Sequence, residues 1–180
     1  MNFIKVEIEG LIIIEPTVYQ DERGYFFEAY NKNNFEKAGI KTQFVQDNQS
    51  LSQKNVLRGL HFQKPPYSQA KLIRIIKGRV LDIAVDLRKG SKTYGQYYSL
   101  ELSEYNKKMF YIPEGFAHGF LTLEDNTIFS YKCSDFYNAE SEDAILWNDK
   151  TIDVDWGIET PILSGKDKKA QCFDQFISPF

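Results

Sequence analysis

The chain has 180 residues, of which 42% are hydrophobic, 26% charged and 15% aromatic, and it carries a formal net charge of −3. This length can close one hydrophobic core, so we expect a single domain over residues 1–180. The acidic balance argues against a general nucleic-acid binder, and no apolar run reaches the roughly 20 residues needed to span a membrane.

The N-terminal third predicts short strands and one helix. Residues 5–16 alternate as one or two strands with a break at their glycine, and residues 25–30 form another strand entered through the turn-like residues 21–24. The segment NNFEKAG predicts a short helix that Asn33 caps and Gly39 ends. The first ten residues alternate and carry charge, which is unlike a signal peptide.

The segment KLIRIIKGRVLDIAVDL predicts two strands joined by a compact hairpin turn at Lys77 and Gly78. Alternate side chains of a strand share a face. One face of the second strand is therefore apolar, with Leu81, Ile83, Val85 and Leu87. The other face holds Val80, Asp82, Ala84 and Asp86, and Lys71 shares its face with Ile73 and Ile75. These charged residues either mark solvated edges or lie in a barrel interior, where a buried charge needs a partner.

Further strands are expected over GQYYSLEL, KMFYIP, HGFLTLE and NTIFSYKCSDFY, whereas the last forty residues lose the alternation and predict loops with a short helix. Roughly ten strands with few helices indicate an all-β fold, an antiparallel sandwich or jelly roll. Cys133 and Cys172 form no disulfide framework, and we interpret them as reduced thiols of a cytoplasmic protein. A single disulfide remains the alternative.

The chain has two histidines, His61 in VLRGLHFQ and His118 in IPEGFAHGF. Each is either a half-buried structural residue or a group for proton transfer, since imidazole has an ordinary pKa of about 6.5. Metal sites usually recruit three or four ligands, and Arg58 and Lys71 would repel a cation, so we expect no metal.

Two other candidates have structural alternatives. Tyr131 shares a strand face with Phe129 and Cys133, which is also the pattern of an amphipathic core tyrosine. Asp167 stands three residues after Ser164, the spacing of a capping box at a helix start.

Several longer motifs occur in a fixed order: DERGYFFE, FVQDNQS, VLRGLHFQ, QAKLIR, GRVLDIAVDLR, IPEGFAHGF, YKCSDFY, LWND and LSGKD. Together they resemble the dTDP-4-dehydrorhamnose 3,5-epimerase family of cupin-type enzymes over about residues 21–167. The resemblance implies a cupin jelly-roll barrel and a 4-keto-6-deoxy sugar substrate linked to dTDP, epimerised at C3 and C5 without a cofactor.

The resemblance also implies catalytic roles. His61 would be the base, Asp167 its orienting partner and Tyr131 the acid on the opposite face of the sugar ring. Lys71 and His118 would stabilise charge that develops on the C4 oxygen.

Binding roles follow in the same way. Arg58 would contact the diphosphate, Tyr137 would stack on the thymine, and Asp82 would support the residues near C4. The complete set of implied substrate-binding residues is Arg23, Glu28, Gln46, Asn48, Arg58, Lys71, Asp82, His118, Tyr137, Glu142 and Lys166. Phe136 departs from the family pattern, because many relatives have a second tyrosine there.

The resemblance further implies a homodimer that exchanges N-terminal strands over about residues 1–45, so Arg23 and Glu28 would serve the partner's site. The core barrel would span about residues 46–137, followed by C-terminal loops and a short helix over about 138–180. Alternatives are an epimerase acting at C3 only on a related nucleotide sugar, a non-catalytic nucleotide-sugar binding module, and a metal-dependent cupin oxygenase. The two-histidine count disfavours the last of these.

Overall fold

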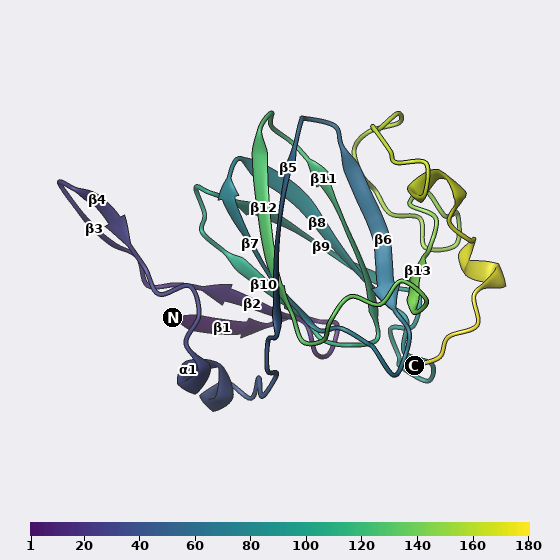
Figure 1. Ribbon diagram of the computed structural model, residues 1–180, viewed down its shortest axis with the longest axis horizontal. Coiled ribbons are helices and arrows are strands. Elements are labelled where there is room, and N and C mark those ends of the chain that lie inside the picture. The colour runs from purple at the N-terminus through teal and green to yellow at the C-terminus, as the bar shows by residue number, and fades with distance from the viewer.

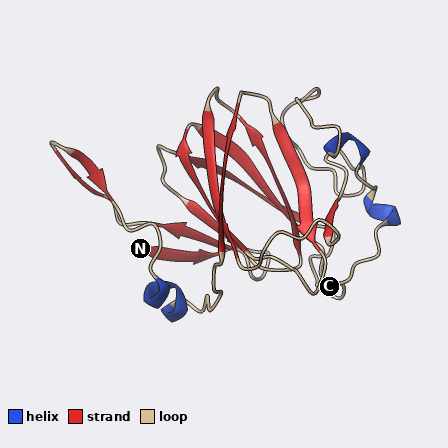
Figure 2. Cartoon of the chain, in the orientation of Figure 1, coloured by secondary structure: helices blue, strands red, loops and turns tan.

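The computed structural model describes all 180 residues, and its two larger antiparallel sheets face each other as a sandwich (Figure 1, Figure 2). The six-stranded sheet has, in spatial order, β1 (Asn2–Lys5), β2 (Ile12–Glu15), β10 (Met109–Ile112), β7 (Lys71–Lys77), β12 (Thr127–Cys133) and β5 (Gln46–Ser52). The five-stranded sheet has β13 (Glu142–Ala144), β6 (Leu57–Gln63), β11 (Phe116–Thr122), β8 (Arg79–Asp86) and β9 (Tyr97–Ser103).

The other elements are a two-stranded hairpin and three short helices. The hairpin is β3 (Tyr19–Asp21) with β4 (Gly24–Phe26), and the helices are α1 (Lys32–Lys37) and the 3₁₀ turns η1 (Asp167–Lys169) and η2 (Phe173–Gln175). No helix here has the length and apolar character needed to cross a membrane.

Three apolar clusters hold the layers together. The first fills the space between the sheets and includes Ile73, Ala84 and Phe129. The second lies on the outer face of the five-stranded sheet, where the C-terminal segment covers it, and the third lies between the six-stranded sheet and α1. Both sheets are therefore buried on more than one face, and the sandwich interior is only one of three cores.

The expected alternation of β8 is confirmed. Val80 and Ala84 belong to the interior cluster, while Ile83 and Val85 belong to the outer one. Asp82 has no exposed surface, so the barrel-interior alternative is correct for this carboxylate and the solvated-edge alternative is wrong.

The compact hairpin expected at Lys77 and Gly78 is wrong. β7 pairs with β10 and β12 in the six-stranded sheet, whereas β8 pairs with β11 and β9 in the facing sheet. The turn is thus a corner at which the chain crosses from one sheet to the other. A period of two broken by a glycine predicts both arrangements equally, because either one buries a face of each strand.

Two N-terminal details also differ from expectation. Asn31, rather than Asn33, caps α1, and its Oδ1 accepts a hydrogen bond from the Asn34 N–H at 3.3 Å. The strand expected over residues 25–30 ends at Phe26. The break expected in residues 5–16 is present, since β1 ends before it and β2 begins after it.

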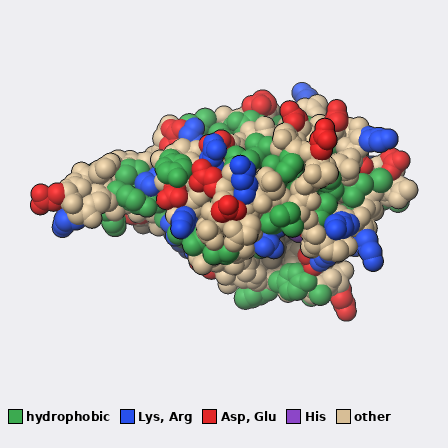
Figure 3. All heavy atoms as spheres, turned by 90° about the horizontal axis from the view of Figure 1, so that it is seen from above, with side chains coloured by type: hydrophobic (Ala, Val, Ile, Leu, Met, Phe, Trp, Pro, Cys, Tyr) green, Lys and Arg blue, Asp and Glu red, His purple; other side chains and the backbone are tan.

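The β3–β4 hairpin projects from the sandwich as an arm (Figure 1), and it also stands clear of the body in a view turned by 90° (Figure 3). All six of its strand residues are exposed. Tyr19, Tyr25 and Phe26 leave more than half of their surface open to solvent, at 64%, 57% and 69%. Large aromatic side chains on a projecting element are unusual for a surface that faces only water.

The turn after β8 is held by a buried carboxylate. Asp86 has no exposed surface and accepts hydrogen bonds from the Arg88 guanidinium at 2.8 and 2.7 Å, from Ser91 at 2.6 Å and from Thr93 at 2.7 Å. Burial alone would raise the pKa of the Asp86 carboxyl, but these hydrogen bonds lower it to about 2. The ionised carboxylate therefore stabilises the fold.

We expect Asp86→Asn to lower the free energy of unfolding by about 2 kcal/mol at neutral pH, measured by urea denaturation. Because the folded-state pKa is depressed from 3.8 to about 2, this stabilisation is present above the ordinary value and is lost as the pH falls toward 2. The exposed Asp47, which pairs with Lys132 at 2.5 Å, is the control, and Asp47→Asn should cost less than about 1 kcal/mol. Equal losses in both variants would contradict the assignment.

Candidate active site

A cavity of about 300 Å³ lies between the two sheets. Its polar side chains come from both of them: β6 and β11 contribute Arg58, His61 and His118, while β5, β7 and β12 contribute Asn48, Ser50, Lys71 and Tyr131. Two stacked rings, Phe120 and Phe129, supply apolar wall with centroids 3.9 Å apart.

An irregularity in β6 brings Arg58 and His61 to the same cavity. Strict alternation would point residues three apart to opposite faces. The register of β6 against β11 shifts at this point, however, so one residue is taken up by a bulge. As a result Leu57 and Leu60 both pack in the outer cluster, whereas Arg58 and His61 both line the cavity.

Two glycines permit this irregularity. Gly59 has a φ of 130°, and a Cβ placed on it would lie 2.5 Å from Gly119 Cα. A Cβ on Gly119 would lie 2.8 Å from the Arg58 carbonyl oxygen. Only residues without a side chain allow β6 and β11 to approach this closely. Strand alternation does not predict this bulge, and the glycines in RGLH and HGF are the sequence feature that indicates it.

His61 is held by a carboxylate from the C-terminal segment. Its Nε2 lies 2.5 Å from Asp167 Oδ1, and Asp167 is buried, with Ser164 Oγ donating to its other oxygen at 2.7 Å. Burial would raise the pKa of Asp167, but hydrogen bonds from His61 and Ser164 keep it below its usual range. The carboxylate accepts the Nε2 hydrogen, so the other nitrogen of the neutral ring can accept a proton. The Asp167 N–H also donates to Ser164 Oγ at 3.1 Å, the backbone contact expected of the capping box, although the N-cap position of η1 is Lys166.

His118 lies opposite His61 in the register of β6 and β11. Its Nε2 is 3.0 and 3.1 Å from the two oxygens of Asp82, and both side chains are buried. Burial lowers the pKa of His118 and raises that of Asp82, while their contact opposes each shift. Burial also lowers the pKa of Lys71, and the charges of Cys133 and Asp82 counteract it. His118 and Lys71 therefore both supply the cavity wall with nitrogen atoms for hydrogen bonds.

Tyr131 comes from the opposite sheet to His61. In β12 it pairs with Asn48 of β5 and Ile73 of β7, and the Lys71 Nζ is 6.0 Å from its ring centroid. Burial raises the pKa of the Tyr131 phenol, so the hydroxyl keeps its proton at neutral pH. A proton acceptor and a protonated phenol therefore face one cavity from two different sheets.

Arg58 is a cation without an acidic partner. Its Nε and Nη2 both donate to Ser52 Oγ at 3.2 Å, and no carboxylate forms an ion pair with it. An unpaired guanidinium in a cavity attracts an anion, and phosphate oxygens match its planar donors.

A hydrogen-bonded rim joins four further predicted residues to Asn48. Tyr137 Oη donates to Glu142 at 2.7 Å, Lys166 pairs with the same carboxylate, and the Tyr137 N–H donates to Gln46 Oε1 at 2.9 Å. Gln46 Nε2 in turn donates to Asn48 Oδ1 at 3.0 Å. Burial would raise the pKa of Glu142, but hydrogen bonds from Lys166 and Tyr137 lower it.

Arg23 and Glu28 are not brought to the cavity. Arg23 pairs with Asp21 at 2.5 Å on the projecting arm, and Glu28 accepts hydrogen bonds from Asn31 and Asn34 beside α1. The remaining predicted residues lie in the cavity or its rim, except Asp82 and Asp167, which are buried and contact the cavity histidines His118 and His61. Ser50 and Ser52 were missed, although the period of β5 places them on the same face as Gln46 and Asn48.

No three side chains among His, Cys, Asp and Glu are grouped to hold a metal ion. Both imidazoles are instead committed to carboxylates. The fold and the cavity thus define a jelly-roll protein with an acid–base site lined by an unpaired cation.

Comparison with known proteins specifies the family. The family model for dTDP-4-dehydrorhamnose 3,5-epimerase matches residues 5–175. The chain is 51% identical to the dTDP-4-dehydrorhamnose 3,5-epimerase of Shigella flexneri over 98% of its own length and all of that protein. It therefore belongs to the dTDP-4-dehydrorhamnose 3,5-epimerase family, a family of isomerases.

Solved structures agree with this assignment. The dTDP-6-deoxy-D-glucose-3,5-epimerase of Legionella pneumophila, crystallised with dTDP-4-keto-L-rhamnose, superimposes with a TM-score of 0.94 at 46% identity and covers 98% of this chain and 94% of its own. A more distant structure, the 3′-monoepimerase ChmJ of Streptomyces bikiniensis, gives 0.89 at 29% identity and covers 94% and 86%. The expected cupin jelly roll is confirmed.

Because burial lowers the pKa of His118, we expect its ring to titrate with a midpoint below the ordinary value of about 6.5. Two histidines make this measurable by NMR of protein labelled with ¹⁵N-histidine, with His61→Asn assigning the signals. Ring shifts of His118 that titrate with a midpoint at or above 6.5 would contradict the expectation.

Proposed function

We propose that this protein converts dTDP-4-dehydro-6-deoxy-D-glucose to dTDP-4-dehydro-L-rhamnose by epimerisation at C3 and C5. The observation that carries the proposal is that His61 and Tyr131 line one cavity from opposite sheets. An epimerisation needs this arrangement, because a proton leaves one face of a carbon and another proton arrives on the opposite face.

The chemistry follows from the ketone at C4. The hydrogens on C3 and C5 flank it, so removing either as a proton gives an enolate rather than an isolated carbanion. His61 takes the proton, and the Asp167 carboxylate stabilises the resulting imidazolium. Tyr131 donates its phenolic proton to the carbon from the other side. His61 then releases its proton to solvent and Tyr131 takes one from solvent, so the reaction consumes no net proton.

Charge on the C4 oxygen is met by Lys71 and His118, with Asp82 holding the imidazole in place. Buried donors aimed at an oxygen that becomes negative in the transition state are worth more than the same donors in water. The pair Asp82–His118 also keeps the ring orientation fixed while the substrate changes.

Substrate binding is proposed for the cavity and its rim. Arg58 contacts the diphosphate, and Lys166 adds positive charge near it. Tyr137, which is 58% exposed, offers a ring face for thymine stacking. Gln46, Asn48 and Glu142 contribute hydrogen bonds to the sugar and nucleotide.

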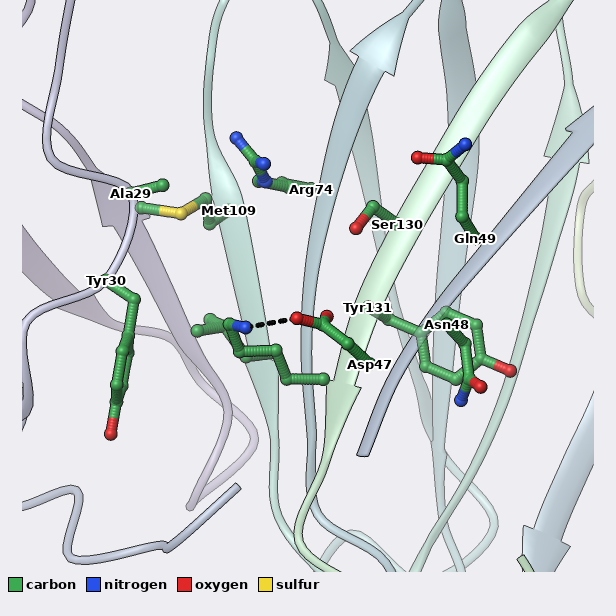
Figure 4. Close-up of a pocket in the computed structure, with 11 residues that line it drawn as sticks. Ala29, Tyr30, Asp47, Asn48, Gln49, Arg74, Met109, Ser130 and Tyr131 are labelled. Carbon is green, nitrogen blue, oxygen red and sulfur yellow. Dashed lines mark hydrogen bonds and ion pairs between the residues drawn. The ribbon is translucent and has the colours of Figure 1, made fainter. Parts of the chain in front are cut away.

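The protein is proposed to act as a homodimer. The arm of β3 and β4 carries exposed aromatic rings, and the outer face of the six-stranded sheet has a cavity of about 450 Å³ (Figure 4). In Figure 4 Tyr30 stands at the margin of this cavity and Asp47 pairs with a lysine, Lys132, across it. We propose that the projecting arm within residues 1–45 packs on the partner, so that Arg23 and Glu28 complete its site, while β1, β2 and α1 stay in their own sheet and third core.

We propose that residues 46–137 form the core of the barrel and that residues 138–180 cover it. Cys133 and Cys172 are free thiols, which supports a reducing compartment, and we propose the cytoplasm. No nucleic-acid or membrane partner is proposed.

The second candidate is an epimerase acting at C3 only. ChmJ has the same fold at 29% identity, so the fold does not separate the two reactions. The 51% identity to a named 3,5-epimerase favours reaction at both carbons.

Turnover in heavy water distinguishes the two candidates. Since each inverted carbon receives its proton from a group that exchanges with solvent, we expect deuterium at both C3 and C5 of the product by NMR. Label confined to C3 would overturn the proposal in favour of the second candidate.

Removal of the base should separate chemistry from binding. We expect His61→Asn to lower turnover by at least about 10⁴-fold while the affinity for dTDP changes little, measured by steady-state kinetics and calorimetry. A His61→Asn enzyme with near-normal turnover would show that the base is misassigned, as a non-catalytic binding module would require.

The two roles of Asp167 are separable by a matched pair. Asp167→Ala should lower turnover by about 10²-fold or more, because the imidazolium loses its counter-charge. Ser164→Ala removes the capping hydroxyl but leaves the contact to His61, so it should lower stability with a far smaller rate loss. If both variants lose stability and retain their rates, Asp167 acts only as a cap.

A further inference from the structure

The inward face of β5 is a row of neutral polar side chains: Asn48 and Ser50 line the cavity, and Gln46 and Ser52 stand on the same face at either end. Gln46 and Asn48 are engaged with each other and with the rim. Ser52 stands at the other end of the row and is buried, with 5% of its surface exposed. It is the side chain to which the Arg58 guanidinium is attached.

Ser52 holds the Arg58 guanidinium through two hydrogen bonds, one from each of two guanidinium nitrogens. Nε and Nη2 both donate to Ser52 Oγ at 3.2 Å, and a hydroxyl oxygen has two lone pairs to accept them. A guanidinium has five N–H donors, so three remain for a ligand. The guanidinium plane is then set by the protein before any anion arrives, which reduces the ordering cost of binding.

A second arginine in the same chain shows what a different partner would do. Arg88 gives Nε and Nη2 to the carboxylate oxygens of Asp86 at 2.8 and 2.7 Å. That pairing orients the guanidinium equally well but cancels its charge. The hydroxyl of Ser52 orients Arg58 and leaves its charge available, which is the choice expected where the arginine must bind an anion.

We propose that Ser52 is a positioning residue for diphosphate recognition, holding the Arg58 guanidinium in its binding orientation without neutralising it. The inference rests on the proposed role of Arg58 as the diphosphate ligand. Ser52 itself touches no substrate and takes no part in proton transfer.

The test measures the affinity for dTDP and for thymidine, which lacks the phosphates, by calorimetry. Ser52→Ala should weaken dTDP binding about tenfold, the range expected for hydrogen bonds to a charged group, and leave thymidine binding unchanged. With substrate, KM should rise by a similar factor while kcat is retained. A merely structural serine would alter neither the ratio of the two affinities nor the balance of KM and kcat.

A double-mutant cycle assigns the effect to Arg58. In the Arg58→Ala background, Ser52→Ala should cause no further loss of dTDP affinity, because there is no guanidinium left to orient. Undiminished loss in that background would overturn the inference while leaving Arg58 as a diphosphate ligand. An Arg58→Ala protein that binds dTDP normally would overturn the proposed role of Arg58 and, with it, the inference.

Three further variants guard against a folding artefact. Ser52→Thr and Ser52→Val have nearly the same shape and differ in the hydroxyl, so the first should retain dTDP affinity and the second should lose it. Ser52→Asp should also lose it, because the carboxylate cancels the charge. Ser103→Ala, a buried serine on β9 whose hydroxyl accepts the Asn106 N–H, is the matched control and should leave the dTDP affinity unchanged. Equal dTDP binding by the Thr and Val variants would overturn the inference.

Discussion

A sandwich interior that holds ionisable groups must give each buried charge a partner, and this constraint shapes the whole site. Charge moved from water into an apolar interior is costly unless it is paired and hydrogen-bonded. The chain meets the condition throughout, with no buried side-chain polar atom left without a hydrogen bond. Asp82 is matched by His118, and Asp167 by His61 and Ser164. Arg58 differs from these groups, because it is exposed and its guanidinium is bonded to a neutral hydroxyl rather than to a carboxylate.

Two facing sheets are also a direct solution to an epimerisation. A planar enolate held between them presents one face to each sheet, so a base on one and an acid on the other meet the carbon from opposite sides. His61 belongs to the five-stranded sheet and Tyr131 to the six-stranded sheet. A single-sheet site would need a flexible loop to supply the second group. Here both groups are carried by paired strands, which hold their geometry more rigidly.

The alternation of side chains between the two faces of a strand made part of this site predictable. Alternation placed Asp82 on one face with Val80 and Ala84, and Lys71 on one face with Ile73 and Ile75, but it left open whether those faces were solvated or interior. In the structure Asp82 is fully buried and Lys71 lines the cavity. Alternation failed where the backbone departs from the regular pleat. Arg58 and His61 share a cavity because of a bulge in β6. That bulge depends on the close approach of Gly59 in β6 to Gly119 in β11, and these two strands are distant in sequence. No local pattern records such a contact, for the same reason that none distinguishes a hairpin from a sheet-to-sheet corner.

The assignments that came from the family motifs rest on a different kind of information. His61 and Asp167 are 106 residues apart, and nothing in either local sequence predicts their contact at 2.5 Å. The segment that delivers Asp167 shows no alternation and was expected as loops with a short helix. It is nevertheless fixed to the sheet, because Ile162 exchanges backbone hydrogen bonds with the residues at the start of β6.

This attachment explains why a loop-rich C-terminal segment is part of the catalytic architecture. In Figure 1 it runs beside β6 on the outer side of the five-stranded sheet, where its apolar side chains, among them Trp156 and Phe176, complete the second core. Packing of that core therefore places η1 against β6, where the Gly59 backbone contributes to the lowered pKa of Asp167. The glycine at the bulge that turns His61 into the cavity thus also lies near the carboxylate that His61 contacts. The register of β6, the packing of the second core and the position of the proposed base all depend on the bulge in β6. A change in the register or in the packing would therefore move the His61 imidazole.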